Sequence, residues 1–312
     1  MPYALSPRAR PRLALAAIAL LLAAAPFVRA AAPNGAQPPA KPPAPQPLPA
    51  AQLEFVISNT IFALLHEFGH VIIRDFGVPL LGMEEDSADT LAALIMLGGA
   101  SQSASPENTA KLTRALALAA VGNALTWQSG VEQQDTEILF WDQHGLSVRR
   151  ASRIACLIYG SNPKQYAWIA DSAKMPDRRR DGCEDEFALA HHAGAWVLDT
   201  YGNRGHKTHE GATPQVTVTY GPARGPALES IRSALQQRGF LEALAHQVDS
   251  AFAFQEPLVV RVSTCGTSNA YWDQDHRELQ LCYELPEAFL TLSHDPAVAK
   301  AYDTVSKAGG MN

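Results

Sequence analysis

The feature that most constrains the fold is a long apolar stretch, Leu53 to Ile73, whose apolar residues have the periodicity of a helix. They recur at intervals of three and four residues, at Ile57, Ile61, Leu64, Leu65, Phe68, Val71 and Ile72. The helix is predicted to end before Gly77-Val78-Pro79, a helix-breaking sequence. Within the stretch stands His66-Glu67-Phe68-Gly69-His70. Three ionisable side chains in so apolar a helix are costly to bury unless a metal ion or another partner engages them.

Two histidines four positions apart project from one face of a helix, so the imidazoles of His66 and His70 can bind the same metal ion. A zinc ion lowers the pKa of a bound water to about 7. Glu67 would lie beside that water and accept its proton during attack on a peptide carbonyl. We therefore expect His66 and His70 to be Zn²⁺ ligands and Glu67 the general base. The alternative is a chance match, with both histidines on the flank of a surface helix.

The third ligand is expected from the acidic segment that opens the next predicted helix, residues 84–97. A catalytic zinc ion usually has three protein ligands. Glu85 and Asp89 are four positions apart and share a helix face. We expect Glu85 to bind the metal and Asp89 to orient a ligand histidine by accepting its free N–H. Glu84 is the alternative to Glu85, and an acidic first turn that complements the helix dipole would explain the segment without a metal.

A second polar motif, Asp142-Gln143-His144, precedes the helix predicted from Leu146 to Tyr159. An imidazole near the metal could stabilise the oxyanion formed during peptide hydrolysis, which makes His144 a candidate catalytic residue. Alternatively, Asp142 caps the following helix and His144 is an ordinary loop residue.

The N-terminus has the pattern of a signal peptide, expected to span residues 1–30. Arg8, Arg10 and Arg12 precede the apolar run Leu13 to Phe27, which is too short for a spanning helix of about 20 residues. Residues 31–50 form an Ala/Pro-rich linker, and residues 51–312 the folded part. We therefore expect export to the periplasm or medium, with no stable membrane span after cleavage.

Charge and cysteine content bear on partners and compartment. Removal of residues 1–30 takes away four arginines and no acids, so the net charge falls from -6 to -10. No basic face for nucleic acid is evident, and we expect a peptide or protein substrate. The four cysteines are expected to form disulfides, because an exported chain with an even count usually pairs them. Proximity favours Cys156 with Cys183 and Cys265 with Cys282, although three pairings are possible.

The pattern predicts an α+β fold in one domain, 51–312. Its first half, about 51–160, is helical and carries the metal site, and its second half, about 161–312, is mixed α/β. Predicted helices span 53–73, 84–97, 105–127, 146–159 and 184–200, and predicted strands span 215–220, 258–264, 270–272 and 278–284. The last two strands flank the turn 273–276, and we expect a small antiparallel sheet. This hairpin is expected to fold back beside the first helix and offer a substrate-binding edge.

The HEFGH segment followed by Glu85-x-x-x-Asp89 resembles the gluzincin metallopeptidases over residues 53–97. That resemblance implies a zincin-like fold in which Glu85, on the second helix, is the third zinc ligand. It also implies that Asp89 contacts a ligand histidine and not the metal itself. Two features depart from it. The interval from His70 to Glu85 is shorter than in thermolysin-like enzymes, and almost no strand-forming sequence precedes the first helix.

A closer resemblance, to the metallopeptidase family DUF4344, extends over much of the mature chain. It rests on the two motifs above together with 142–146, Cys156-Leu157-Ile158-Tyr159-Gly160, Cys183-Glu184, 265–271 and Leu281-Cys282-Tyr283-Glu284-Leu285.

Together these patterns predict a zinc-dependent peptidase. The competing hypothesis is a non-catalytic envelope protein that is stabilised by zinc or binds a partner. The presence of Glu67 counts against it, because a structural zinc site needs no base at this position.

Overall fold

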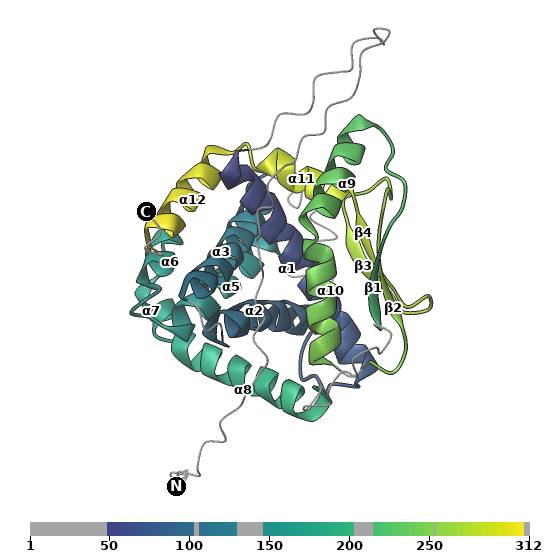
Figure 1. Ribbon diagram of the computed structural model, residues 1–312. Helices are drawn as coiled ribbons and strands as arrows, with labels where there is room; N and C mark the ends of the chain where they lie inside the picture. Colours follow the sequence, from purple (N-terminus) through teal and green to yellow (C-terminus); the bar gives the residue numbers. More distant parts are fainter. Residues whose placement is uncertain (1–48, 103–105, 130–145, 203–214, 253, 309–312) are drawn as a thin grey trace, which may run out of the picture.

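The computed structural model describes residues 49–102, 106–129, 146–202, 215–252 and 254–308. Its fold is α+β and mainly helical, as predicted, with a helical bundle beside a four-stranded sheet (Figure 1). The helices are α1 (Ala50–Asp75), α2 (Glu84–Gln102), α3 (Pro106–Gln128), α5 (Ser147–Ser161), α6 (Ala167–Ser172), α7 (Asp177–Arg180), α8 (Cys183–Tyr201), α9 (Pro226–Arg238), α10 (Phe240–Ala251), α11 (Glu284–Leu292) and α12 (Pro296–Ala308). The strands are β1 (Val216–Tyr220), β2 (Leu258–Ser263), β3 (Ala270–Asp273) and β4 (Glu278–Cys282).

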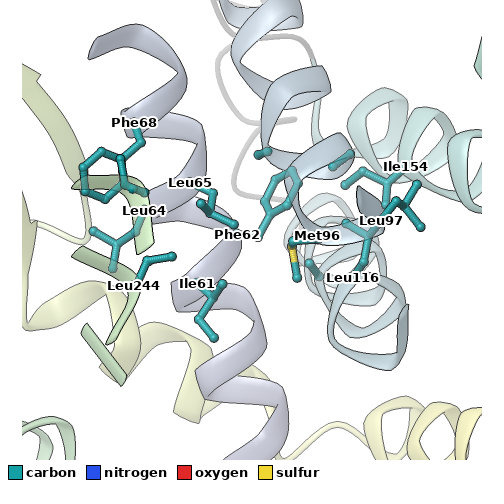
Figure 2. Packing of buried hydrophobic residues seen from close by; sticks show 14 of the residues in the cluster. Ile61, Phe62, Leu64, Leu65, Phe68, Met96, Leu97, Leu116, Ile154 and Leu244 are labelled. Atoms are coloured by element: carbon teal, nitrogen blue, oxygen red, sulfur yellow. The ribbon is translucent and has the colours of Figure 1, made fainter. Parts of the chain in front are cut away.

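Helix α1 is the central helix of the core. It packs against α2, α3, α11 and the hairpin strand β3, and every residue from Leu64 to Ile73 is buried. Figure 2 shows Ile61 and Leu64 near Leu244 of α10. The other side of α1, with Phe62 and Leu65, faces α2, α3 and α5. The residues labelled there are Met96 and Leu97 of α2, Leu116 of α3 and Ile154 of α5. Of the described helices, α1 alone has the length and apolar composition of a membrane span, but 89% of its most apolar window is buried within the protein.

Helices α1 and α2 approach very closely at Gly69. A Cβ atom on this residue would lie 2.9 Å from Cα and 3.1 Å from the carbonyl oxygen of Ala88. Only a hydrogen atom fits there, because real Cβ atoms do not come so close to a neighbouring backbone. Ala88 is fully buried and lies between Glu85 and Asp89 on α2. The contact therefore brings both acidic residues up to the face of α1 that carries the histidines.

The sheet is mixed: the antiparallel pairing expected for the hairpin is confirmed, but the expectation that the whole sheet is antiparallel is wrong. Its strand order is β1-β2-β4-β3. Strand β2 is parallel to both β1 and β4, and only the hairpin pair β3–β4 is antiparallel. The physical reason is the connection between β1 and β2. It contains α9 and α10, which return the chain to the starting end of the sheet and so produce a parallel neighbour.

The hairpin β3–β4 lies beside α1, as expected from the sequence. Strand β3 is at the edge of the sheet and packs against α1. Arg277 donates two hydrogen bonds, of 2.6 and 2.8 Å, to the carboxylate of Asp75, the last residue of α1. The Nη1 group of Arg74 also donates to Gln274 in the hairpin turn, at 3.3 Å. The hairpin is thereby attached to the C-terminal end of α1.

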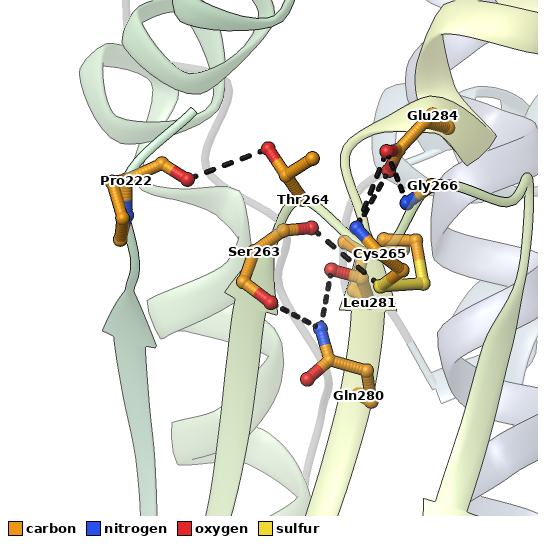
Figure 3. The surroundings of a disulfide bond; sticks show 9 residues. Pro222, Ser263, Thr264, Cys265, Gly266, Gln280, Leu281 and Glu284 are labelled. Atoms are coloured by element: carbon orange, nitrogen blue, oxygen red, sulfur yellow. Dashed lines mark hydrogen bonds between the residues drawn. A yellow bond between two sulfur atoms is a disulfide. The ribbon is translucent and has the colours of Figure 1, made fainter. Parts of the chain in front are cut away.

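Both disulfides predicted from sequence proximity are present. The bond Cys156–Cys183 joins α5 to the start of α8, and Cys265–Cys282 joins the loop after β2 to the end of β4. Figure 3 shows the carboxylate of Glu284 accepting hydrogen bonds from the backbone N–H groups of Cys265 and Gly266. The disulfide and this carboxylate together hold the loop that leads into β3.

Candidate metal centre

Three side-chain atoms from α1 and α2 converge at one point. The Nε2 atoms of His66 and His70 are 3.2 Å apart. Oε2 of Glu85 lies 3.0 Å from Nε2 of His66 and 3.4 Å from Nε2 of His70. Both histidines are buried, and the Glu85 side chain is 15% exposed. The structure therefore brings together the three residues for which the sequence predicted metal ligation.

The other nitrogen of His66 is held by a carboxylate. Its Nδ1 lies 2.7 Å from Oδ1 of Asp89, the partner expected from the sequence. Arg150 of α5 binds that carboxylate with two parallel hydrogen bonds, from Nε to Oδ2 at 2.8 Å and from Nη2 to Oδ1 at 2.6 Å. The Nε2 atom of His66 is thus directed towards Glu85.

His70 is held in the same manner by Glu84. Its Nδ1 lies 2.7 Å from Oε1 of Glu84. Arg74 donates to both oxygens of this carboxylate, at 2.8 and 3.1 Å. In the structure, Glu84 therefore lies behind His70 and Glu85 lies at the point of convergence. This arrangement favours Glu85 over Glu84 as the candidate ligand.

Glu67 lines a cleft together with His66, one of the three converging residues. The cleft has a volume of about 470 Å³, and its lining includes His66, Glu67 and Arg150. Its other walls come from α3, α11 and residues 268–270 at the start of β3. Glu67 is only 7% exposed. A molecule in this cleft would contact Glu67 and His66 together.

Burial and charge perturb the protonation of these groups in the metal-free protein. Burial lowers the pKa of His66, but hydrogen bonds to Asp89 and Glu85 outweigh it and raise that pKa to about 9. Burial raises the pKa of Asp89, but its bonds to His66 and Arg150 bring it down to about 2. Burial raises the pKa of Glu67 to about 7, against the opposing charges of the two histidines. Perturbed carboxylates and imidazoles in one cleft are typical of functional sites.

Sequence reasoning missed the two arginines of the site. A signal was available for Arg150, which precedes Ile154 and Leu157 by four and seven positions and so shares the buried face of α5. A charge on such a face usually has a buried partner. No comparable signal marked Arg74, whose side chain is 49% exposed. The candidates Asp142 and His144 lie outside the described residues.

A comparison with family models identifies the group to which the chain belongs. In a search of curated proteins nothing matches the chain, and no solved structure matches it. One family model covers residues 44–198 and 220–310, which includes α1, α2 and the hairpin. The protein is therefore a member of the DUF4344 family, which is described as "Putative metallopeptidase".

Proposed function

We propose that this protein is a zinc-dependent peptidase in which His66, His70 and Glu85 hold the metal and Glu67 is the general base. The observation that carries the proposal is the convergence of two imidazole nitrogens and a carboxylate oxygen, with one of the two histidines, His66, lining a cleft beside Glu67. Asp89 is the outer partner that orients His66.

The spacing of the three ligand atoms fits zinc. Ligands bonded at about 2.0–2.1 Å in a tetrahedral site lie roughly 3.3 Å from one another. The three separations among His66, His70 and Glu85 are 3.0, 3.2 and 3.4 Å. Two nitrogens and one carboxylate oxygen are also a typical donor set of catalytic zinc, which keeps a further position open.

The charges around the site also favour a divalent cation. Within the described residues, four carboxylates (Glu67, Glu84, Glu85 and Asp89) face two guanidinium groups, Arg74 and Arg150. A dication would balance the two remaining negative charges, with both histidines neutral. In the metal-free protein a proton on His66, whose pKa is raised to about 9, supplies part of this positive charge, and zinc would displace that proton on binding.

Zinc bound here would supply a Lewis acid that lowers the pKa of a water and polarises the scissile carbonyl. The carboxylate of Glu67 accepts the proton of the attacking water and later gives it to the leaving amine. Asp89 and Glu84 keep the imidazoles of His66 and His70 in the tautomer that presents Nε2 to the metal.

The substrate is proposed to bind as an extended peptide along β3. No other strand of the described residues pairs with the outer edge of β3, and residues 268–270 line the cleft beside His66 and Glu67. A peptide strand added there would form backbone hydrogen bonds next to the metal. Replacing successive peptide N–H groups of a cleaved substrate by N-methyl groups should raise KM at alternating positions. Equal effects at all positions would contradict strand addition.

His144 remains a proposed stabiliser of the oxyanion. The substitution His144→Ala should lower kcat with little change in zinc content. Unchanged turnover would exclude the catalytic role.

The protein is proposed to act in the periplasm or outside the cell, after cleavage near residue 30. The two disulfides are typical of proteins that fold in an oxidising compartment. N-terminal sequencing of the mature protein tests this directly. A mature chain that still begins at Met1 would contradict it.

The experiment that tests the function compares the purified mature protein with its Glu67→Gln variant. Both should contain one zinc ion per chain, and only the wild type should cleave a mixture of peptides. Zinc in both with cleavage by neither would favour the non-catalytic alternative. Absence of zinc from the wild type would contradict both hypotheses.

A further inference from the structure

Arg150 occupies a position in the site that the proposed chemistry does not explain. It comes from α5, which supplies none of the proposed metal ligands, yet it lines the same cleft as His66 and Glu67. Its side chain is only 20% exposed. The guanidinium carbon lies 6.0 Å from the ring centre of Phe62, one turn before His66 on α1. The side chain of Arg150 therefore extends from α5 towards α1 and α2, the two helices that carry the proposed ligands.

The hydrogen bonds of Arg150 leave the carboxylate of Asp89 little freedom. A bidentate arginine–carboxylate pair fixes the plane of the carboxylate as well as its distance. Oδ1 of Asp89 accepts from Nη2 of Arg150 at 2.6 Å and lies 2.7 Å from Nδ1 of His66. Because one oxygen serves both partners, the plane that Arg150 imposes also sets the direction of the imidazole.

A neighbouring ion pair joins the same two helices, α5 and α2, without contacting the proposed metal site. Arg153 of α5 binds Asp86 of α2, one turn from the Arg150–Asp89 pair, and its side chain is 26% exposed. It also donates to Thr90 at 3.1 Å. Both arginines thus join α5 to α2 through an aspartate, but only Asp89 contacts a histidine of the site.

We propose that Arg150 is a positioning residue for the metal centre: through Asp89 it fixes the orientation of His66 and so raises the affinity of the site for zinc. This inference rests on the proposed metal ligands but not on peptidase activity. Arg153 contributes to helix packing alone. Outer partners of metal-bound histidines commonly change metal affinity by 10- to 100-fold.

The test measures zinc affinity of the mature protein by competition with a coloured chelator, for the wild type, Arg150→Gln and Arg153→Gln. Arg150→Gln should bind zinc about 10- to 100-fold more weakly. Arg153→Gln, which removes a comparable contact between the same helices, should stay within roughly threefold of the wild type. Thermal unfolding of the metal-free proteins checks that both variants fold.

Two further readouts separate orientation from charge. The visible spectrum of the cobalt-substituted protein should shift in Arg150→Gln and not in Arg153→Gln, because it reports ligand geometry. Arg150→Lys keeps the charge but cannot form two parallel hydrogen bonds. It should recover only part of the lost affinity.

Equal losses in the two glutamine variants, an unshifted cobalt spectrum or complete rescue by lysine would each overturn the proposal. So would a wild type that binds no zinc, since there would then be no ligand to orient. A wild type that binds zinc but cleaves no peptide would contradict the proposed function alone, and the affinity comparison would still decide the role of Arg150.

Discussion

Gly69 of α1 lies directly against the backbone of Ala88 in α2: a Cβ atom on Gly69 would lie 2.9 Å from Cα of Ala88. The glycine stands between His66 and His70, and the alanine stands between Glu85 and Asp89. The two helices can therefore approach this closely only because residue 69 has no side chain. Their close approach in turn brings the imidazoles of α1 to the carboxylates of α2.

The substitution Gly69→Ala should push α2 away from α1. We expect a loss of about 1–3 kcal/mol in the free energy of unfolding, the usual cost of overpacking. Zinc affinity should fall as well, because Glu85 moves with α2. The control is Gly82→Ala in the loop between the helices, where the added Cβ would meet no atom of the described residues within 4 Å apart from its chain neighbours. Chemical denaturation and zinc titration of both variants check this, and similar behaviour of the two would refute it.

The proposed metal site gives Glu84 and Glu85 different roles. Glu84→Gln should weaken zinc binding by about 10- to 100-fold, because it disturbs only the orientation of His70. Glu85→Gln should weaken it further, because it removes a ligand. Isothermal titration with zinc measures the difference. The reverse order of the two losses would show that Glu84 is the ligand.

Asp89 should make stability depend on pH in the metal-free protein. Folding lowers the pKa of this carboxyl from its ordinary value of 3.8 to about 2. Its ionised form therefore stabilises the fold above pH 4 by about 2 kcal/mol, and this contribution is lost as the pH falls through 2. Urea unfolding of the wild type and Asp89→Asn, with zinc chelated, should show a stability difference that shrinks from pH 5 to pH 2. A constant difference would be inconsistent with this mechanism.

The two disulfides should differ in their effect on substrate binding. The bond Cys265–Cys282 holds the loop that carries cleft residues 268–270, whereas Cys156–Cys183 joins α5 to α8. Each closes a loop, with sequence separations of 17 and 27, and should contribute about 3 kcal/mol to stability. Replacing the first pair by alanine should also raise KM for a peptide, with zinc content unchanged. Comparable KM increases in both double variants would argue against a special role for the cleft loop.

Helix periodicity predicted α1, α2, α3, α5 and α8, although α2 continues to Gln102, past its predicted end at residue 97. It did not predict the mixed sheet. The direction of a strand depends on the path of the chain that connects it to its neighbour. Helices α9 and α10 form the connection between β1 and β2, and their sequence carries no local signal of which strands will pair.

What the sequence determined by itself is the chemistry of the candidate ligands and their spacing along two helices. His66, Glu67, His70, Glu85 and Asp89 follow from helix periodicity, which is a local property. Only the tertiary structure decided that Glu84 is hydrogen-bonded to Nδ1 of His70 and that Arg150 donates hydrogen bonds to Asp89. Those pairings depend on how closely α1, α2 and α5 pack, and packing distance is set by contacts between residues far apart in the chain.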